Sequence, residues 1–140
     1  SFPAGPEMTD LAMRGRSASV LPSSVRALQV SFSGAESQAQ RLWAGGTFRP
    51  EDMAAETLSC VVRSVAKLLA AAAAQTGVFH ILLAGGVISS RYVREHLPGR
   101  LASLEERARL FWAREELSGD NAAGVALLGE EIHTRQRREL

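Results

Sequence analysis

The stretch Phe79-His80-Ile81-Leu82-Leu83-Ala84-Gly85-Gly86 decides which fold this sequence predicts. Its mostly apolar first part follows Gly77, a pattern typical of a short strand buried on both faces, as in a parallel sheet. The strand runs directly into two glycines, after which Ser89 or Ser90 can cap a helix. A strand that enters a glycine loop at the start of a helix is typical of α/β proteins that hold a nucleotide at a strand end.

The other elements can be predicted outward from this strand. The clearest is a helix that starts at Pro50, where the fixed φ of proline and the charges of Glu51 and Asp52 suit a first turn, and stops at Gly77. The strand–helix–strand–helix order of the second half predicts an α/β fold with an at least partly parallel sheet. The expected helices cover 7–14, 36–43, 50–76, 91–96 and from 118–121 to about 135, and the expected strands cover 27–32, 79–84 and 109–113.

Length and composition predict one ordinary globular domain over residues 1–140. The formal net charge of +1 leaves no electrostatic sign of nucleic-acid binding. No apolar run is expected to reach the roughly 20 residues needed to span a bilayer, so no membrane partner is expected. The single cysteine, Cys60, lies on the apolar side of a helical pattern and is expected to be a buried bystander. Together these features favour a cytoplasmic protein.

Two loops satisfy the rule that ligands of open α/β sheets bind beyond the carboxyl ends of the strands: Gly85-Gly86-Val87 and Ser118-Gly119-Asp120-Asn121. Glycines let a ligand approach the backbone, and helix N-termini favour negative charge, but glycines that serve only a tight turn explain the first loop equally well. Asp120 can either cap a helix or carry charge to a metal or phosphate, and spacing alone favours the cap.

The three histidines are too widely separated to form a helical metal-binding pair. His80, in the predicted strand, is expected to be a core residue rather than a ligand. His133 is expected at the surface, and no Ser/His/Asp set can be assembled.

Four short segments, in order, resemble one family. They are Phe2-Pro3-Ala4-Gly5-Pro6, Ser31-Phe32-Ser33-Gly34, Ala84-Gly85-Gly86-Val87 and Asp120-Asn121-Ala122-Ala123. They resemble the proteins of tRNA threonylcarbamoyladenosine synthesis, also named O-sialoglycoprotein endopeptidase or glycoprotease. The resemblance covers only about the C-terminal half of such a protein. It implies an actin-like ATPase (ribonuclease H-like) lobe, a mixed sheet with packed helices, and a missing N-terminal lobe.

The resemblance also implies a site. Gly5 and Gly85-Gly86 would face ATP or an adenylate, and Ser90 stands where the family has a nucleoside-contacting Asn. Asp120 would supply one carboxylate to a divalent metal, iron or zinc. The family's other metal ligands form a His-x-x-x-His pair that this sequence lacks, so the chain alone is expected neither to hold the metal nor to be active. The implied partners are tRNA and a protein of the same superfamily.

Three functions remain open at this level. The first is part of an enzyme that transfers a threonylcarbamoyl group from an adenylate to adenosine of tRNA. The second, which Ser90 and the missing histidine pair favour, is a non-catalytic relative that binds a nucleotide or a protein. The third is half of a sugar-kinase-like ATPase, against which the segments 2–6 and 31–34 argue.

Overall fold

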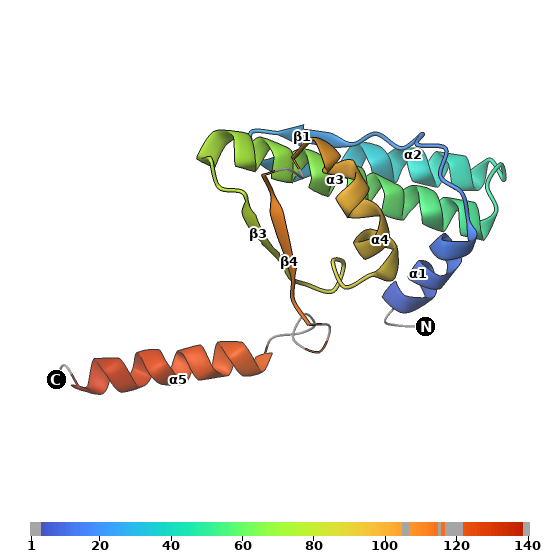
Figure 1. The fold of residues 1–140 in the computed structure, drawn as a ribbon. Coiled ribbons are helices and arrows are strands. Elements are labelled where there is room, and N and C mark those ends of the chain that lie inside the picture. Colours follow the sequence, from blue (N-terminus) through green and yellow to red (C-terminus); the bar gives the residue numbers. More distant parts are fainter. Residues whose placement is uncertain (1–3, 105–106, 115, 117–121, 139–140) are drawn as a thin grey trace.

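The computed structural model of the chain describes residues 4–104, 107–114, 116 and 122–138. Figure 1 shows helices and short strands in the order α1(Gly5–Arg14), β1(Ser24–Arg26), β2(Gln29–Ser31), α2(Ser33–Ala44), α3(Pro50–Thr76), β3(His80–Leu83), α4(Arg91–Arg100), the 3₁₀ helix η1(Ala102–Leu104), β4(Arg109–Trp112) and α5(Ala122–Arg138). The predicted α/β fold class is confirmed.

Helix α3 is the centre of the fold. It contacts α1 and α4 as well as α2 and the β1–β2 pair. Its limits were predicted correctly, with Pro50 in the first turn and Gly77, at φ 70°, in the left-handed conformation that ends the helix. The main core lies between α1, α3, α4 and one face of β3–β4, and it contains Ala12, Ala54, Ala55, Leu58, Val62, Ala66, Leu83, Tyr92, Val93, Leu97 and Leu101.

By length and composition α3 is apolar enough to cross a membrane, with a mean hydropathy of 1.5 over its most apolar window. The expectation that no segment is long and apolar enough to span a bilayer was therefore wrong. In this fold α3 packs in the core instead, because side chains such as Ala55 and Val62 are buried against neighbouring elements. Cys60 of α3 is also buried, as expected, and its Sγ lies 3.2 Å from the carbonyl oxygen of Pro22.

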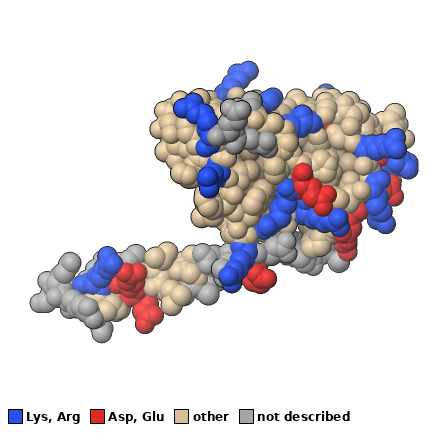
Figure 2. Space-filling model, viewed as in Figure 1, with Lys and Arg blue, Asp and Glu red and all other residues tan. Residues whose placement is uncertain are grey.

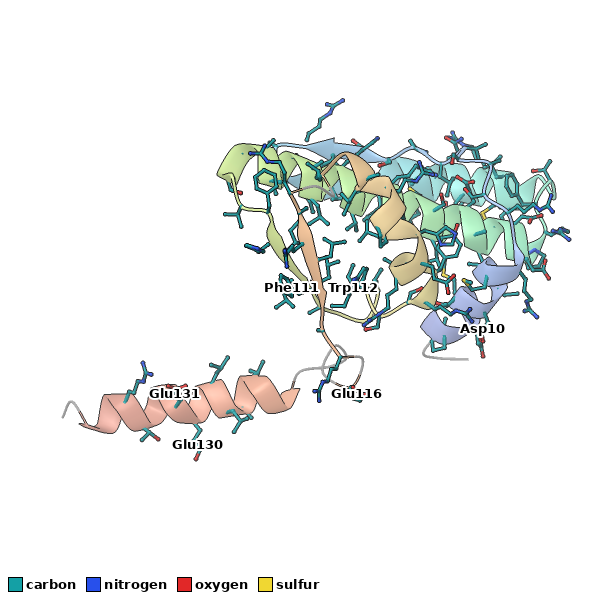
Figure 3. All side chains as sticks on the ribbon, viewed as in Figure 1. Asp10, Phe111, Trp112, Glu116, Glu130 and Glu131 are labelled. Atoms are coloured by element: carbon teal, nitrogen blue, oxygen red, sulfur yellow. The ribbon has the colours of Figure 1, made fainter. Side chains whose placement is uncertain are left out.

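Strands β3 and β4 pair in parallel, with His80 opposite Arg109 and Leu83 opposite Trp112. Side chains alternate between the two faces of a strand, and Figure 3 shows Phe111 and Trp112 on opposite sides of β4. Trp112 and its neighbours on that face pack on the core, whereas Phe111 is 52% and Leu82 70% exposed. The prediction of burial on both faces was wrong, because no described element covers the second face, and His80 is exposed there rather than in the core.

The expected strand 27–32 is a hairpin instead. Strands β1 and β2 pair antiparallel, and Ala27 and Leu28 form the turn between them at φ 48° and 62°. Positive φ is unusual for these residue types, so nothing in their identity predicted the turn. The described strands form this antiparallel pair and the separate parallel pair, rather than the single mixed sheet that was expected.

Helix α4 continues past Pro98 and Gly99, where an end was predicted, to Arg100. It closes with a hydrogen bond from Leu101 N to the Pro98 carbonyl oxygen, 2.8 Å long, so the helix extends two residues beyond the proline. β4 was predicted nearly correctly. The expected start of the last helix at 118–121 lies outside the described residues; α5 runs from 122 and extends away from the other elements in Figure 1.

Glu56 of α3 is fully buried and holds the segment that follows α1. Its Oε2 accepts hydrogen bonds of 2.7 Å each from Ser17 Oγ and Ser19 N, and its Oε1 accepts one of 2.9 Å from Leu21 N. A guanidinium nitrogen of Arg63 lies 3.5 Å from Oε1. Burial raises the pKa of Glu56, but these donors outweigh it and leave the pKa below its usual value of 4.5. The carboxylate is therefore ionised in the fold.

The end of α1 abuts the first turn of α3. A Cβ built on Gly15 would lie 1.9 Å from the Glu51 carbonyl oxygen, so only glycine fits there. One residue further, Arg16 N donates a 2.9 Å hydrogen bond to Asp52 Oδ1. The Arg49 guanidinium bonded to Asp52, together with this backbone donor, lowers the pKa of Asp52 to about 2.

Candidate functional site

A cavity of about 480 Å³ opens where α1 approaches the loop between β3 and α4. Three of the residues implied by the resemblance, Gly5, Gly86 and Ser90, line it together although they are far apart in the sequence. Gly85 lies next to the cavity in the chain but is not one of its lining residues. Asp120 lies outside the described residues. The full lining is Gly5, Pro6, Met8, Thr9, Asp10, Leu58, Gly86, Val87, Ser89, Ser90 and Arg91.

The two glycines of the loop have different tasks. Gly85 has φ +113°, a conformation that other residues adopt only with strain, and its carbonyl oxygen accepts hydrogen bonds from Ser89 N and Ser89 Oγ at 3.0 and 3.1 Å. Gly85 therefore makes the turn. Gly86 lines the cavity, and a Cβ at this position would meet no atom within 4 Å. A ligand can approach the main chain at Gly86.

The N-termini of two helices meet at the cavity. α1 begins at Gly5 and α4 begins at Arg91, and neither of their N-cap residues, Ala4 and Ser90, makes a side-chain capping hydrogen bond. Ser90 is thus at the predicted cap position but does not cap. Uncapped helix N-termini carry unpaired backbone N–H groups and a partial positive charge, which suit a phosphate or carboxylate ligand.

Instead of capping, the Ser90 hydroxyl lies 2.9 Å from that of Thr9, which is 81 positions away. The Thr9 hydroxyl donates to the Gly5 carbonyl oxygen at 3.0 Å. Because a hydroxyl has one hydrogen, Ser90 is the donor in the pair and keeps its acceptor lone pairs for the cavity. This bond connects the two helix starts across the site.

Thr9 was missed by the sequence analysis, because the predicted helix began at Glu7, whereas the observed α1 begins at Gly5 and places Thr9 one helical turn later. Asp10, also missed, brings a carboxylate to the same cavity, and Figure 3 shows it on α1. Arg91 lines the cavity too, but its guanidinium is paired with Glu95 at 2.7 Å. Figure 2 shows basic and acidic side chains intermixed over this view, in keeping with the net charge of +1.

The described residues do not fit a metal. No three His, Cys, Asp or Glu side chains among them lie close enough together to hold an ion. His96 stacks on Tyr92 with ring centroids 4.0 Å apart, and His80 lies near Phe111 on the exposed sheet face. The side chain of His133 falls outside the described residues. Any metal would therefore need ligands from outside this part of the chain.

Comparison with known proteins identifies the family. The sequence profile of tRNA N6-adenosine threonylcarbamoyltransferase matches residues 1–127. The chain belongs to this family. The family's threonylcarbamoyltransferase from Thermococcus gammatolerans is 31% identical over 91% of the chain, and the one from Methanopyrus kandleri is 36% identical over 94%. The resemblance stated from the four segments is thus confirmed.

The chain spans only part of its relatives: 39% of the length of the T. gammatolerans protein and 37% of that from M. kandleri. Among solved structures, T. kodakarensis HypF superposes with a TM-score of 0.66 over 91% of this chain and 17% of HypF, at 18% sequence identity. At that identity the similarity concerns the fold alone. It supports an α/β fold that recurs as part of larger proteins.

Proposed function

We propose that this chain is the nucleotide-binding part of a larger threonylcarbamoyltransferase that modifies adenosine of tRNA, built as an actin-like ATPase (ribonuclease H-like) lobe. The observation that carries the proposal is the cavity at which Gly5, Gly86 and Ser90 meet. Family membership supplies the reaction class, and the cavity supplies a place for the nucleotide.

The chemistry of the cavity suits ATP or an adenylate. The exposed backbone of Gly86 and the uncapped starts of α1 and α4 favour phosphate oxygens. The apolar side chains of Met8, Leu58 and Val87 offer a wall for a base or ribose. Because Ser90 retains acceptor lone pairs, it can accept a hydrogen bond from a ribose hydroxyl or a base amino group.

The proposed enzyme needs more than this chain. Asp120 is proposed to supply one carboxylate to an iron or zinc ion whose other ligands come from an N-terminal lobe, which would explain why the relatives are longer. The exposed apolar face of Leu82 and Phe111, together with Val125, Leu127 and Leu128 of α5, offers surface for such a lobe or for a partner of the same superfamily. tRNA binding follows from the family alone, and the proposed setting is cytoplasmic.

One observation favours a second candidate, a non-catalytic relative that keeps the nucleotide site. Ser90 replaces the Asn that the family resemblance places there, and its hydroxyl is engaged with Thr9. A serine lacks the paired donor and acceptor of an amide, so recognition of the nucleoside would be weaker or different. This variant of the site would bind without supporting transfer.

Threonylcarbamoyl transfer to tRNA by the full-length gene product separates the two candidates. We expect the full-length protein to be active, Asp120→Asn to reduce transfer at least about 100-fold, as loss of a metal contact does, and Glu130→Gln on α5 to have no effect. Residues 1–140 alone should be inactive and bind no stoichiometric metal. Full activity of Asp120→Asn would indicate that Asp120 only caps a helix. A full-length protein that binds ATP but is inactive would favour the non-catalytic relative.

A further inference from the structure

A second cavity, also of about 480 Å³, lies between α1, α3, α4 and the segment after α1. It shares no lining residue with the candidate nucleotide site. Its lining consists of Ala12, Met13, Gly15, Arg16, Ser17, Ser19, Ser59, Val62, Tyr92, His96 and Arg100.

Two arginines give this cavity its charge. Arg16 and Arg100 come from separate segments, and neither guanidinium makes a hydrogen bond or ion pair within the described part of the chain. The acidic group that acts on Arg16 electrostatically, Asp52, is already bonded to Arg49 at 2.8 Å. No carboxylate is among the lining residues. The cavity therefore presents two unpaired cations, which fit an oxyanion with several acceptor oxygens.

Three serines, Ser17, Ser19 and Ser59, add hydroxyl groups to the lining of this cavity. Ser19 is fixed at φ 56°, an unusual conformation for serine, by the 2.7 Å hydrogen bond from its N–H to the buried Glu56. Strain of this kind often marks a functional position. Ser19 is one of the lining residues, and its hydroxyl makes no hydrogen bond within the described residues. The negative charge of Glu56 is compensated by Arg63, 3.5 Å away, so it does not oppose an anion.

We propose that this second cavity binds a phosphate group, with Arg16 and Arg100 as charged donors and Ser19 as a neutral donor. The phosphate belongs either to a small ester or to the backbone of an RNA, because the same donors serve both. Tyr92 and His96, which stack at 4.0 Å with planes 11° apart, form an aromatic wall beside it. This inference does not depend on the proposed nucleotide site.

Calorimetric titration of the full chain with inorganic phosphate, against chloride at equal ionic strength, tests the proposal. We expect phosphate to bind, and the Arg16→Ala/Arg100→Ala double variant to bind at least about tenfold more weakly. Arg26→Ala, a surface arginine outside the cavity, should bind as the native chain does. If the double variant loses structure by circular dichroism, the Lys double variant, which keeps charge but not the planar fork, should bind with intermediate affinity.

A short single-stranded RNA distinguishes the source of the phosphate. If it is an RNA backbone, the oligomer binds and each lost arginine reduces the slope of log affinity against log salt by about 0.7. If it is a small ester, inorganic phosphate and a phosphomonoester bind and the oligomer does not. Phosphate binding that is no stronger than chloride binding, or that is unchanged in the double variant, would overturn the proposal.

Discussion

Glu56→Gln is expected to lower the free energy of unfolding by about 3–5 kcal/mol, the usual cost of removing one charged partner from a buried ion pair. The carboxylate accepts three hydrogen bonds from Ser17, Ser19 and Leu21 and faces Arg63. Glutamine has only one acceptor oxygen, and its NH₂ group would face N–H or O–H donors where the second carboxylate oxygen now accepts. Buried donors would therefore lose their acceptor. Chemical denaturation monitored by circular dichroism measures the change.

A matched substitution is available on the surface. Glu36 in the first turn of α2 is exposed, and Glu36→Gln should cost no more than about 0.5 kcal/mol, through its weak interaction with the helix dipole. Equal stabilities of the Glu56 and Glu36 variants would show that the buried network contributes little.

The pH dependence of stability offers a second test of the hydrogen bonds and charges around Glu56. The folded-state pKa of Glu56 lies below its usual 4.5, because the hydrogen bonds and Arg63 outweigh burial. A lowered pKa contributes stability that is present above the usual value and is lost as pH falls through the folded-state value. Asp52 adds a smaller loss between pH 3.8 and about 2. The native chain should therefore lose stability below about pH 4.5 more steeply than Glu56→Gln does.

Gly15→Ala is expected to cost about 3 kcal/mol or more, at the upper end of overpacking. The added Cβ would lie 1.9 Å from the Glu51 carbonyl oxygen and 2.9 Å from Asp52 N, both main-chain atoms that no side-chain rotation can move. Helix α1 would have to move off α3, which would disturb both cavities, since residues of α1 line each of them. Thermal unfolding measures the effect.

Gly99→Ala is the control for this substitution. Gly99 lies inside α4, and a Cβ there would meet no atom within 4 Å. Alanine at a compatible helical glycine stabilises by roughly 0.5–1 kcal/mol, so the two substitutions should shift stability in opposite directions. A Gly15→Ala protein as stable as the native one would mean that α1 does not pack against α3 as described.

The features that could be predicted from the sequence are those that local residues determine. Pro50 and Gly77 delimited α3, and glycines on either side of 79–84 delimited β3. The errors are long-range. Whether Leu82 is buried depends on which element covers the sheet, and the apolar residues of a strand do not predict this.

The site residues, too, were predicted where a local motif marks them and missed where a long-range contact does. Gly5, Gly86 and Ser90 could be named because short motifs resemble those of the family, and they do line one cavity. Thr9 was missed because its importance comes from the bond to Ser90, a contact between distant segments. Arg63 likewise could not be singled out, because its role comes from its contact with the Leu21 carbonyl oxygen at 2.6 Å, 42 positions away in the chain, and from its charge beside Glu56. A partner that lies far away in the chain leaves no periodic signal.

Titration of ATP into the full-length gene product and its Gly86→Leu variant tests whether the cavity between α1 and the β3–α4 loop holds the nucleotide. Gly86 lines the cavity, and a Cβ there would meet no protein atom within 4 Å, so we expect the fold to tolerate leucine while the larger side chain takes space from the ligand. We expect ATP to bind the full-length protein, Gly86→Leu to weaken this binding at least about tenfold, and Gly99→Ala to leave it unchanged. ATP that binds Gly86→Leu as tightly as the native protein, or that binds neither, would contradict this placement of the nucleotide.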